Sequence, residues 1–554
     1  MPDCTDWESL VGRIAAWAAQ DTEYGTELAT WSLNPTGQRM LAEPFTNVVA
    51  FGTAGIRAVM GPGPGRMNQI VVEECAAAIF EHLVQDNETT RCGDVRIVIG
   101  YDGRLNSARY AHAAAQVLAG LGAQVHLFGT HTPTPVLAYA IRELGADAGL
   151  MVTASHNPRE ENGMKLYLGD GRQIISPVDT SIATILHRRL RSICEGNRER
   201  CRDAAAPFTM LDGMLVDAYV ARVVHTTATD LPLDTIAVAY TPLHGVGHAV
   251  LADVCALLAH VELHTVADQQ DPDGTFPSCP RPNPENDTNL APLLELAESC
   301  SAQLAVANDP DADRCRIAVR DRTGTMQLLN GDEIGALLLW WLAQRRGGAL
   351  DGTVASSVVS STLTAKLAVH YGAQHVLCAT GFKWLTRPEQ LVYAYEEALG
   401  YCCDPSAVND KDGISAAAHL ITAAAWLHAR HSSLHEQLLE MYREHGTHLQ
   451  AQISFPAGRG EWLLPGVPGE PVGPTQTVSL TENLDMFDLA YGTATGQGLH
   501  TAGGGATGRM IVRRSGTEPI VKLYLEAVSP NPDDAQRALD ELVAYTQRRR
   551  PGAQ

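Results

Sequence analysis

The segment Asn308-Asp-Pro-Asp-Ala-Asp-Arg314 places three carboxylates at alternate positions. It follows the apolar run 304–307, so we expect a buried strand to open into a loop here. In an extended chain the side chains of Asp309, Asp311 and Asp313 would point to one side. Carboxylates held that close repel one another unless a hard cation neutralises them, and Mg²⁺ prefers such oxygen ligands. The segment therefore indicates a Mg²⁺ site, and an acidic surface turn is the alternative.

A serine stands in a turn of small residues in Met151-Val-Thr-Ala-Ser-His-Asn-Pro158. An apolar strand again leads into the turn, which leaves Ser155 with little steric cover. A hydroxyl beside His156 could act as a nucleophile or carry a phosphoryl group, or it could cap a helix. The Gly-x-Ser-x-Gly elbow of hydrolases is not present. Lys165 follows soon after and can bring a cation back to the same loop.

A third group lies in Arg513-Arg-Ser-Gly-Thr-Glu-Pro519, between two expected strands. Two guanidinium groups, two hydroxyls and a glycine that exposes backbone N–H groups suit a phosphate ion. A charged hairpin turn is the alternative, although a turn has no need of this set of side chains. The residues predicted to hold phosphate are Arg514, Ser515, Gly516, Thr517 and the nearby Lys522.

Three further segments carry weaker signals. Flexible backbone precedes Arg57 in Phe51-Gly-Thr-Ala-Gly-Ile-Arg57. Asp102 and Arg104 are expected to shape their own loop through hydrogen bonds. Glu397 could face sugar hydroxyls or belong to an ordinary solvated helix start.

These groups need elements that position them, and three stretches share the order strand, loop, helix, strand. They cover residues 95–128, 235–266 and 352–377, and the loop of the third is rich in Ser and Thr. This order is the unit of a layered α/β domain, so we predict three related α/β domains.

The C-terminal part has a different pattern, because 509–513 and 520–526 are expected strands and 531–550 an expected helix. Residues 455–474 and 493–508 are dense in Gly or Pro and are expected to be loop or linker. A strand–loop–strand–helix order predicts a smaller α+β domain. The predicted domain limits are 1–207, 208–322, 323–447 and 448–554.

Length and charge agree with a multidomain globular protein. The 554 residues suffice for three or four domains, and 41 Lys and Arg against 63 Asp and Glu give a formal charge of −22. That balance argues against nucleic-acid or anionic-membrane binding. The acidic N-terminus has no signal-peptide pattern, and the longest apolar run, 334–343, is about half a bilayer span. We expect reduced thiols and a cytoplasmic location.

Together these segments resemble the α-D-phosphohexomutase superfamily along nearly the whole chain. Residues 153–158 resemble its phosphoserine loop, 309–314 its metal loop and 513–519 its phosphate-binding loop. The chain is more closely similar to the branch with phosphoglucomutase-2, phosphopentomutase and glucose-1,6-bisphosphate synthase. That similarity rests on Phe51-Gly-Thr-Ala-Gly55, Thr380-Gly-Phe-Lys-Trp384, Glu396-Glu-Ala-Leu-Gly-Tyr401 and Asp410-Lys-Asp-Gly413.

The resemblance implies three α/β domains with mixed sheets in three layers, plus a smaller C-terminal α+β domain, around a central cleft. It implies a phosphoglucomutase, a phosphopentomutase or both, which move a phosphoryl group between hydroxyls 1 and 6 of a hexose or 1 and 5 of a pentose. Ser155 would be phosphorylated and would give its phosphate to a sugar monophosphate. The sugar bisphosphate then turns over and returns its other phosphate. One Mg²⁺ per chain would be held by Asp309, Asp311, Asp313 and the phosphoserine. Arg57, Lys165 and His156 would act at the transferring phosphate.

For the substrate, the resemblance implies that Arg314 fixes the metal loop and that the C-terminal loop grips the distal phosphate. Lys383 and Glu397 would lie near the sugar. Leu399 and Tyr401 replace a Ser and a His of many relatives, so hexose specificity does not carry over. A sugar 1,6-bisphosphate would be the activator, sugar phosphates the ligands, and the enzyme a monomer or homodimer.

Several alternatives remain at this point. Within the family they are phosphomannomutase and glucose-1,6-bisphosphate synthase. Outside it, a phosphatase could use Asp309 as its nucleophile, or the chain could be a non-catalytic regulator that binds sugar phosphates.

Overall fold

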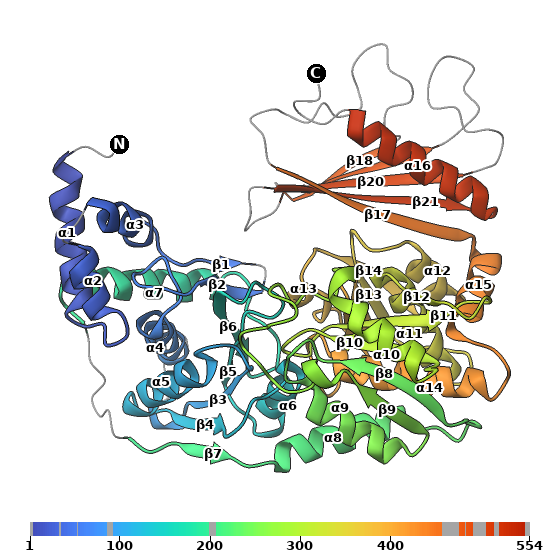
Figure 1. Ribbon diagram of the computed structural model, residues 1–554, viewed down its shortest axis with the longest axis horizontal. Coiled ribbons are helices and arrows are strands. Elements are labelled where there is room, and N and C mark those ends of the chain that lie inside the picture. The colour runs from blue at the N-terminus through green and yellow to red at the C-terminus, as the bar shows by residue number, and fades with distance from the viewer. Residues whose placement is uncertain are drawn as a thin grey trace. The chain divides into compact units, whose positions relative to one another are not determined.

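The computed structural model describes residues 4–32, 35–52, 54–85, 92–198, 206–456, 476–481, 484–490, 506–514 and 520–548 (Figure 1). The chain forms two compact units. Unit 1 comprises 1–320, 326–329 and 398–429, and unit 2 comprises 321–325, 330–397 and 430–554. The serine turn and the aspartate segment thus lie in unit 1, whereas Glu397 and Lys522 lie in unit 2.

The first sheet of unit 1 has seven strands in the order β1-β2-β6-β5-β3-β4-β7. Its middle strands β3 and β5 run parallel, and β6 lies antiparallel beside β5, so the sheet is mixed. Helices pack on it, and Ile97 and Ile99 are fully buried. The strands are β1 (Phe51–Gly52), β2 (Gly55–Val59), β3 (Arg96–Tyr101), β4 (Gln124–Phe128), β5 (Ala148–Val152), β6 (Glu161–Leu168) and β7 (Thr209–Leu211). The helices are α1 (Cys4–Ala18), α2 (Gly25–Trp31), α3 (Pro35–Thr46), α4 (Gln69–Gln85), α5 (Ser107–Gly120), α6 (Thr134–Glu143) and α7 (Val178–Cys194).

The second sheet of unit 1 has the order β12-β11-β10-β8-β9. β8 and β10 are parallel, and β11 returns antiparallel to β10, so the aspartate segment joins two neighbouring strands. Every residue of β10 is buried. The strands are β8 (Ile236–Thr241), β9 (Val261–Thr265), β10 (Leu304–Asn308), β11 (Cys315–Arg320) and β12 (Met326–Leu328). Unit 1 also contains α8 (Met214–Thr227), α9 (Gly247–Leu258), α10 (Ala291–Ser299), β16 (Gly400–Cys402) and α14 (Gly413–His428).

In unit 2, β13 (Thr353–Ser357) lies between β14 (Gln374–Cys378) and β15 (Leu391–Glu396), and both pairings are parallel. The helices of this part are α11 (Gly331–Gln344), α12 (Leu363–His370), α13 (Phe382–Leu385) and α15 (Leu434–His445). α11 begins with a capping box, in which Asn330 and Glu333 each bond the other's backbone N–H.

The C-terminal sheet of unit 2 has the order β17-β21-β20-β19-β18, and all its pairings are antiparallel. α16 (Pro532–Arg548) lies on the sheet, where Leu539 and Leu542 pack against Leu523 and Leu525 (Figure 1). The strands are β17 (Thr447–Pro456), β18 (Gln476–Thr481), β19 (Leu484–Ala490), β20 (Thr507–Arg514) and β21 (Ile520–Ser529).

The three predicted strand–loop–helix–strand stretches are present as β3-α5-β4, β8-α9-β9 and β13-α12-β14. The two predicted C-terminal strands and the helix are present too. β17, β18 and β19 were not predicted. β17 carried a readable signal, because Leu449, Ala451 and Ile453 alternate with polar residues and pack against the C-terminal core. Most of the predicted Gly- and Pro-rich loops lie outside the described residues.

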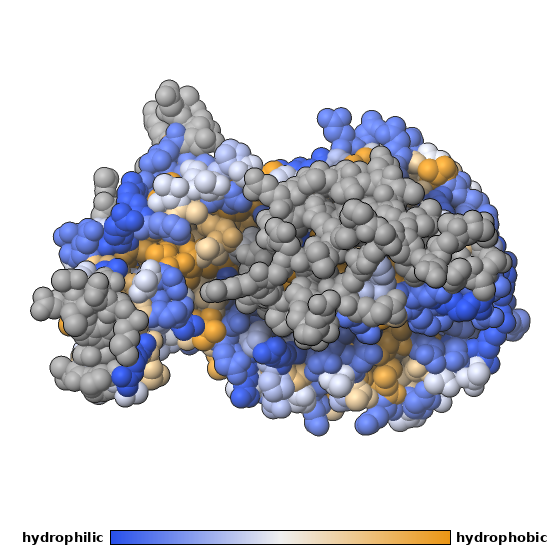
Figure 2. Space-filling view, turned by 90° about the horizontal axis from the view of Figure 1, so that it is seen from above, coloured by the Kyte–Doolittle hydropathy of each residue, from blue (hydrophilic) through white to orange (hydrophobic). Residues whose placement is uncertain are grey.

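None of the helices in the described part of the chain is both long and apolar enough to span a bilayer. On the face shown in Figure 2, most of the coloured surface is hydrophilic, and apolar residues occur as separate patches.

Candidate active site

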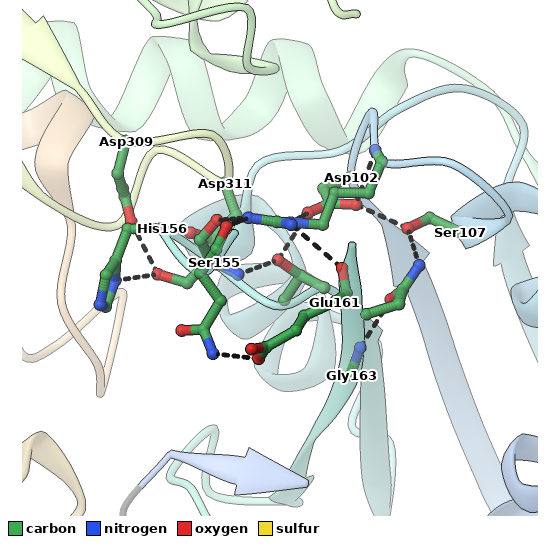
Figure 3. Close-up of polar contacts among 12 residues, drawn as sticks. Asp102, Ser107, Ser155, His156, Glu161, Gly163, Asp309 and Asp311 are labelled. Carbon is green, nitrogen blue, oxygen red and sulfur yellow. Dashed lines mark hydrogen bonds and ion pairs between the residues drawn. The ribbon is translucent and has the colours of Figure 1, made fainter. Parts of the chain in front are cut away.

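Ser155 lies in the turn that follows β5, and its backbone adopts the left-handed conformation, with φ 52°. The residue is buried, and its N–H donates to the Thr153 hydroxyl at 2.8 Å. The Ser155 hydroxyl donates to Asp309 Oδ2 at 2.7 Å and lies 3.1 Å from His156 Nδ1 (Figure 3). No helix occurs in 153–160, all of which are described, so a helix-capping role for Ser155 is excluded.

The buried Arg104 holds the serine turn by its backbone. Its guanidinium donates to the carbonyl oxygens of Ser155 at 2.5 Å, Asn157 at 2.6 Å, Pro158 at 2.9 Å and Glu161 at 3.1 Å. The main acceptors thus lie inside the turn, so one planar donor group fixes its shape.

Asp102 supports both Arg104 and the turn. Its carboxylate accepts hydrogen bonds from Thr153 at 2.6 Å, Ser107 at 2.7 Å and the Arg104 N–H at 3.0 Å (Figure 3). The prediction that Asp102 and Arg104 shape their own loop is correct, because Asp102 accepts from the Arg104 N–H and the Ser107 hydroxyl. Both residues also hold the turn that carries Ser155.

The aspartate segment is a turn and not the extended stretch that was expected. Ala312 has φ 57°, and its N–H bonds the carbonyl oxygen of Asp309 at 2.9 Å. The three carboxylates nevertheless converge, because one oxygen of each lies within 4.8 Å of the others. The curled backbone, and not strand alternation, therefore gathers them.

Two hydrogen bonds and the close approach of α14 stabilise this turn. Asn308 donates to the Arg314 carbonyl oxygen at 2.6 Å, and the Arg314 N–H donates to Asp309 Oδ1 at 3.0 Å. A Cβ on Gly413, the first residue of α14, would lie 2.2 Å from the same Arg314 oxygen. Only glycine fits there.

Two lysines and a threonine surround the carboxylates. The fully buried Lys165 ammonium donates to Asp311 at 2.6 Å and to Asp313 at 2.5 Å, and Lys411 lies 3.2 Å from Asp313. Thr134, the first residue of α6, donates to Asp311 at 2.6 Å.

The pKa values of two of these buried carboxyl groups are shifted in opposite directions. Burial, with Asp311 and Asp313 close by, raises the pKa of Asp309 to about 8. Burial would also raise the pKa of Asp311, but Lys165 outweighs it and the pKa falls below its usual range. Burial alone would lower the pKa of Lys165, yet the two carboxylates raise it above the ordinary value. Lys165 is therefore a charged ammonium.

The residues present suit a hard divalent cation. Asp311 Oδ1 and Asp313 Oδ1 are buried and have no hydrogen-bond partner among the described residues. Buried carboxylate oxygens are normally paired, so two orphaned oxygens beside Asp309 fit an oxygen-ligating ion such as Mg²⁺. A second group of possible ligands, His370, Glu444 and His445, lies mostly exposed on unit 2 and contains the imidazoles that Mg²⁺ does not favour.

Arg57 and His156 lie at the same turn. Arg57 donates to Asn157 Oδ1 at 2.8 Å from β2. Burial, together with Arg314, Arg57 and other cations, lowers the pKa of His156 well below its usual value, so its imidazole is neutral. Arg314 lies 3.5 Å from Glu285. Unit 1 thus brings together Ser155, His156, Arg57, Lys165, Arg314 and the three aspartates.

The other predicted site residues belong to unit 2. Glu397 accepts hydrogen bonds from Ser357 at 2.8 Å and Ser360 at 3.2 Å, and Lys383 lies on α13. Lys522 pairs with Arg513 across β21 and β20. Arg514 ends β20, and neither its side chain nor Ser515, Gly516 and Thr517 are among the described residues.

Two residues of the site, Thr134 and Lys411, were not predicted from the sequence. Thr134 stands in Thr132-Pro-Thr-Pro135, a pattern without a catalytic signature. Lys411 stands in the Asp410-Lys-Asp-Gly413 segment, which contributed only to the resemblance. A cation beside an acidic motif is the one signal that pointed toward Lys411.

Models of four domains from one family match the chain in sequence order. The model described as phosphoglucomutase/phosphomannomutase, alpha/beta/alpha domain I, matches 48–191, and domains II and III match 217–324 and 330–445. The C-terminal domain of the same family matches 503–543.

Named proteins are similar over nearly their whole length. A probable phosphomannomutase of Haemophilus influenzae is 37% identical over 494 residues, which cover 86% of this chain and 96% of that protein. The phosphopentomutase of Homo sapiens is 31% identical over 590 residues, covering 96% and 94%.

A solved structure shows the same fold. The crystal structure of a phosphoglucomutase/phosphomannomutase family protein from Burkholderia thailandensis aligns with a TM-score of 0.66 at 20% identity and covers 91% of this chain and 98% of that one. The predicted fold class, three α/β domains with mixed sheets and a small C-terminal domain, is thereby confirmed.

Proposed function

The chain belongs to the phosphoglucomutase/phosphomannomutase family, and we propose that it moves a phosphoryl group between two hydroxyls of one sugar phosphate. The hydroxyls would be 1 and 6 of a hexose or 1 and 5 of a pentose. The contact of the buried Ser155 hydroxyl with the aspartate triad carries this proposal. The two named relatives, a probable phosphomannomutase and a phosphopentomutase, support a hexose or pentose phosphate as substrate.

Ser155 is the proposed carrier, because the two sugar positions cannot occupy one site at the same time. In the first transfer the bond from phosphorus to the Ser155 oxygen breaks, and a bond to the free sugar hydroxyl forms. That hydroxyl loses its proton, and the Ser155 oxygen gains one. The sugar bisphosphate then turns over, and its other phosphate returns to Ser155. A sugar 1,6-bisphosphate would act as activator because it can phosphorylate Ser155.

The chain's own groups support these steps. The neutral imidazole of His156, 3.1 Å from the Ser155 hydroxyl, can accept or return a proton there. Arg57 and Lys165 place positive charge beside the serine turn, where the phosphoryl oxygens would lie. Arg104 holds the backbone so that the hydroxyl keeps its direction.

Mg²⁺ would be held by Asp309, Asp311, Asp313 and an oxygen of phosphorylated Ser155, and it would offset the negative charge on the phosphoryl group. Arg314 is proposed to stabilise the metal loop. Glu397 and Lys383 are proposed to contact the sugar. For the distal phosphate we propose Arg514, Ser515, Gly516, Thr517 and Lys522.

A phosphatase with Asp309 as nucleophile is the less favoured alternative. Both oxygens of Asp309 accept hydrogen bonds, one from Ser155 and one from the Arg314 N–H. These contacts make Asp309 a partner of Ser155, and an aspartyl phosphatase would leave the buried Ser155 hydroxyl, which also lies 3.1 Å from His156 Nδ1, without a role.

The test is ³¹P NMR with Mg²⁺ and catalytic glucose 1,6-bisphosphate, with glucose 1-phosphate, ribose 1-phosphate and mannose 1-phosphate in separate tubes. Conversion to the 6- or 5-phosphate supports a mutase, and the fastest tube identifies the substrate. Ser155→Ala is expected to abolish conversion. Release of inorganic phosphate alone, unaffected by Ser155→Ala, would establish the phosphatase instead. No turnover in any tube would favour a binding protein. In a further tube with stoichiometric 1,3-bisphosphoglycerate, formation of glucose 1,6-bisphosphate from glucose 1-phosphate without conversion to the 6-phosphate would indicate a bisphosphate synthase.

A further inference from the structure

The loop that follows β13, Ser357-Val-Val-Ser-Ser-Thr362, has no part in the proposed chemistry, although its hydroxyl content is high for one loop. We call it the serine loop. It lies in unit 2 together with Glu397 and the C-terminal sheet. Serine hydroxyls in such number need acceptors when they are buried, and Ser357, Ser360 and Ser361 are all buried.

One side of the serine loop holds Glu397. The hydroxyls of Ser357 and Ser360 donate to Glu397 Oε2 at 2.8 Å and 3.2 Å, and the Glu397 N–H donates back to the Ser360 hydroxyl at 3.1 Å. The carboxylate and the backbone of Glu397 are therefore both placed by this loop.

The other side of the serine loop holds the C-terminal sheet. Glu526 of β21 accepts from the Ser361 hydroxyl at 2.7 Å and from the Thr362 N–H at 2.8 Å. Arg509 of β20 pairs with Glu526 at 3.0 Å and donates to the carbonyl oxygens of Ser360 and Val358.

Apolar contacts reinforce the same joint, because Val358 and Val359 pack against Ile511 and Tyr524. Glu526 is 3% exposed, and the His448 imidazole lies 3.1 Å from it, so its charge is well compensated inside the protein. Breaking these buried contacts would leave charges unpaired, so separating the serine loop from the C-terminal sheet is expected to be costly.

The pairing of β20 with β21 places residues at the predicted phosphate-binding loop on the same face of the sheet as Arg509 and Glu526. Across β20 and β21 the facing pairs are Arg509 with Glu526, Ile511 with Tyr524, and Arg513 with Lys522. Alternate residues of a strand share one face, so these three pairs lie in a row. The face that holds the serine loop therefore leads directly to Lys522, a proposed phosphate-binding residue.

We propose that the serine loop couples the C-terminal sheet to Glu397, and that Glu526 and Arg509 are positioning residues for recognition of the sugar. This rests on the proposed function, because it takes Glu397 as a sugar contact and Lys522 as a phosphate contact. A sugar bisphosphate that must turn over between two transfers has to be bound and released by its sugar contact, Glu397, and its phosphate contact, Lys522, at the same time. The serine loop supplies that coupling, because it contacts both Glu397 and the sheet that carries Lys522.

The first test needs no substrate and follows amide hydrogen exchange of the full chain with Glu526→Gln. The Glu397 N–H bonds the Ser360 hydroxyl, so a displaced serine loop is expected to speed its exchange about tenfold, as for one lost hydrogen bond. The Thr362 N–H donates directly to Glu526, so faster exchange of this amide shows that the substitution has weakened the contact between the serine loop and β21. Faster exchange at Thr362 with unchanged exchange at Glu397 would overturn the coupling.

Two further variants keep this test decisive. Glu436→Gln breaks an exposed Arg322–Glu436 pair of the same unit, so it is expected to leave exchange at Glu397 unchanged. Arg509→Lys keeps the positive charge but loses the planar fork that reaches two carbonyl oxygens. If Glu526→Gln does not fold, Arg509→Lys takes its place. Faster exchange of the Glu397 N–H then supports the proposal, and unchanged exchange there with faster exchange at Thr362 overturns it.

The second test is a double-mutant cycle on KM for the substrate found by ³¹P NMR. Glu526→Gln and Glu397→Gln are each expected to raise KM about tenfold. If Glu526 acts through Glu397, the double variant has the KM of Glu397→Gln alone. Effects that multiply to about a hundredfold would overturn the positioning role. If the natural chain has no mutase activity, the proposed function fails, and hydrogen exchange still decides whether the coupling exists.

Discussion

The Ser155 hydroxyl donates a 2.7 Å hydrogen bond to Asp309, although 154 positions separate the two residues in the chain. β5 and β10 each end in a loop, and the two loops meet at this bond. A phosphate on Ser155 would stand directly against the three aspartates. That arrangement demands positive charge, which Lys165, Lys411, Arg57 and a divalent cation would supply.

Asp309→Asn tests whether the Asp309 charge is needed for transfer. Asparagine keeps the size and one carbonyl oxygen but removes the negative charge that Asp309 would carry when it holds the metal ion. We expect a loss of about 10²–10³ in kcat/KM with little change in the unfolding midpoint, because a metal ion often contributes several kcal/mol to transfer. Steady-state kinetics with Mg²⁺ and urea unfolding measure the two quantities. Activity close to that of the natural chain would show that Asp309 does not serve the reaction.

Arg104→Met tests the clamp on the serine turn. The variant leaves Asp102 without its guanidinium and removes a donor from four carbonyl oxygens, so the free energy of unfolding is expected to fall by about 3–5 kcal/mol. Chemical denaturation of the full chain measures this. Arg159→Met, which breaks the exposed Arg159–Glu160 pair, is the matched control and is expected to change stability by less than about 1 kcal/mol. Equal losses in the two variants would contradict the clamp.

Removal of Mg²⁺ is expected to affect a Lys165→Met variant more than the natural chain. Lys165 already neutralises Asp311 and Asp313, so its loss leaves more of the carboxylate charge to the cation, although Lys411 still lies 3.2 Å from Asp313. The rise in melting temperature on adding saturating MgCl₂ after EDTA treatment should be larger in the variant by the equivalent of at least about 1 kcal/mol. Differential scanning calorimetry measures it.

Arg222→Met serves as the control for the metal experiment, because Arg222 pairs with Asp404 away from the triad. Its Mg²⁺ response should equal that of the natural chain. An identical response in Lys165→Met would mean that the ammonium and the metal do not share the carboxylates.

The strands and helices of the α/β repeats were predictable because their periodicity is local. Ile97 to Ile99 is an apolar run of the kind that a strand buried on both faces requires, and it lies in β3, whose residues after Arg96 are all buried. β17 shows where local signals were overlooked, since its period-two pattern stands beside a Gly- and Pro-rich stretch that drew the interpretation toward loop.

The site was predictable in its residue types but not in its geometry. Spacing identified the aspartates, yet the left-handed Ala312 curls the segment that was expected to be extended. The four-carbonyl clamp of Arg104 and the approach of Lys411 depend on contacts between segments far apart in sequence, which no local pattern encodes. The residues around Ser155 allowed a nucleophile, a phosphoryl carrier or a helix cap, and the resemblance pointed to the carrier, but its contact with Asp309 joins two segments that no local pattern connects.

The pKa of Asp332 provides a pH test of unit 2. Burial raises the pKa of this carboxyl to about 7, and Glu397 and Glu526 add to the shift. The folded form thus binds a proton that the unfolded chain has lost above about pH 4, so this contribution to stability is complete below that pH and is lost as pH rises through 7. The free energy of unfolding should fall by a few kcal/mol over this pH range, at about 1.4 kcal/mol per pKa unit.

Asp332→Asn removes this titration while keeping an oxygen that can accept from the Ser361 N–H and the Tyr395 hydroxyl. We therefore expect the slowest-exchanging amides of α11 to lose protection between pH 5 and 8 in the natural chain but much less in the variant, after correction for intrinsic exchange. Glu526, whose pKa falls to about 2 because His448 and Arg509 outweigh the effect of burial, stays ionised throughout this range and contributes no slope. Parallel pH profiles in the two proteins would show that Asp332 is not the titrating group.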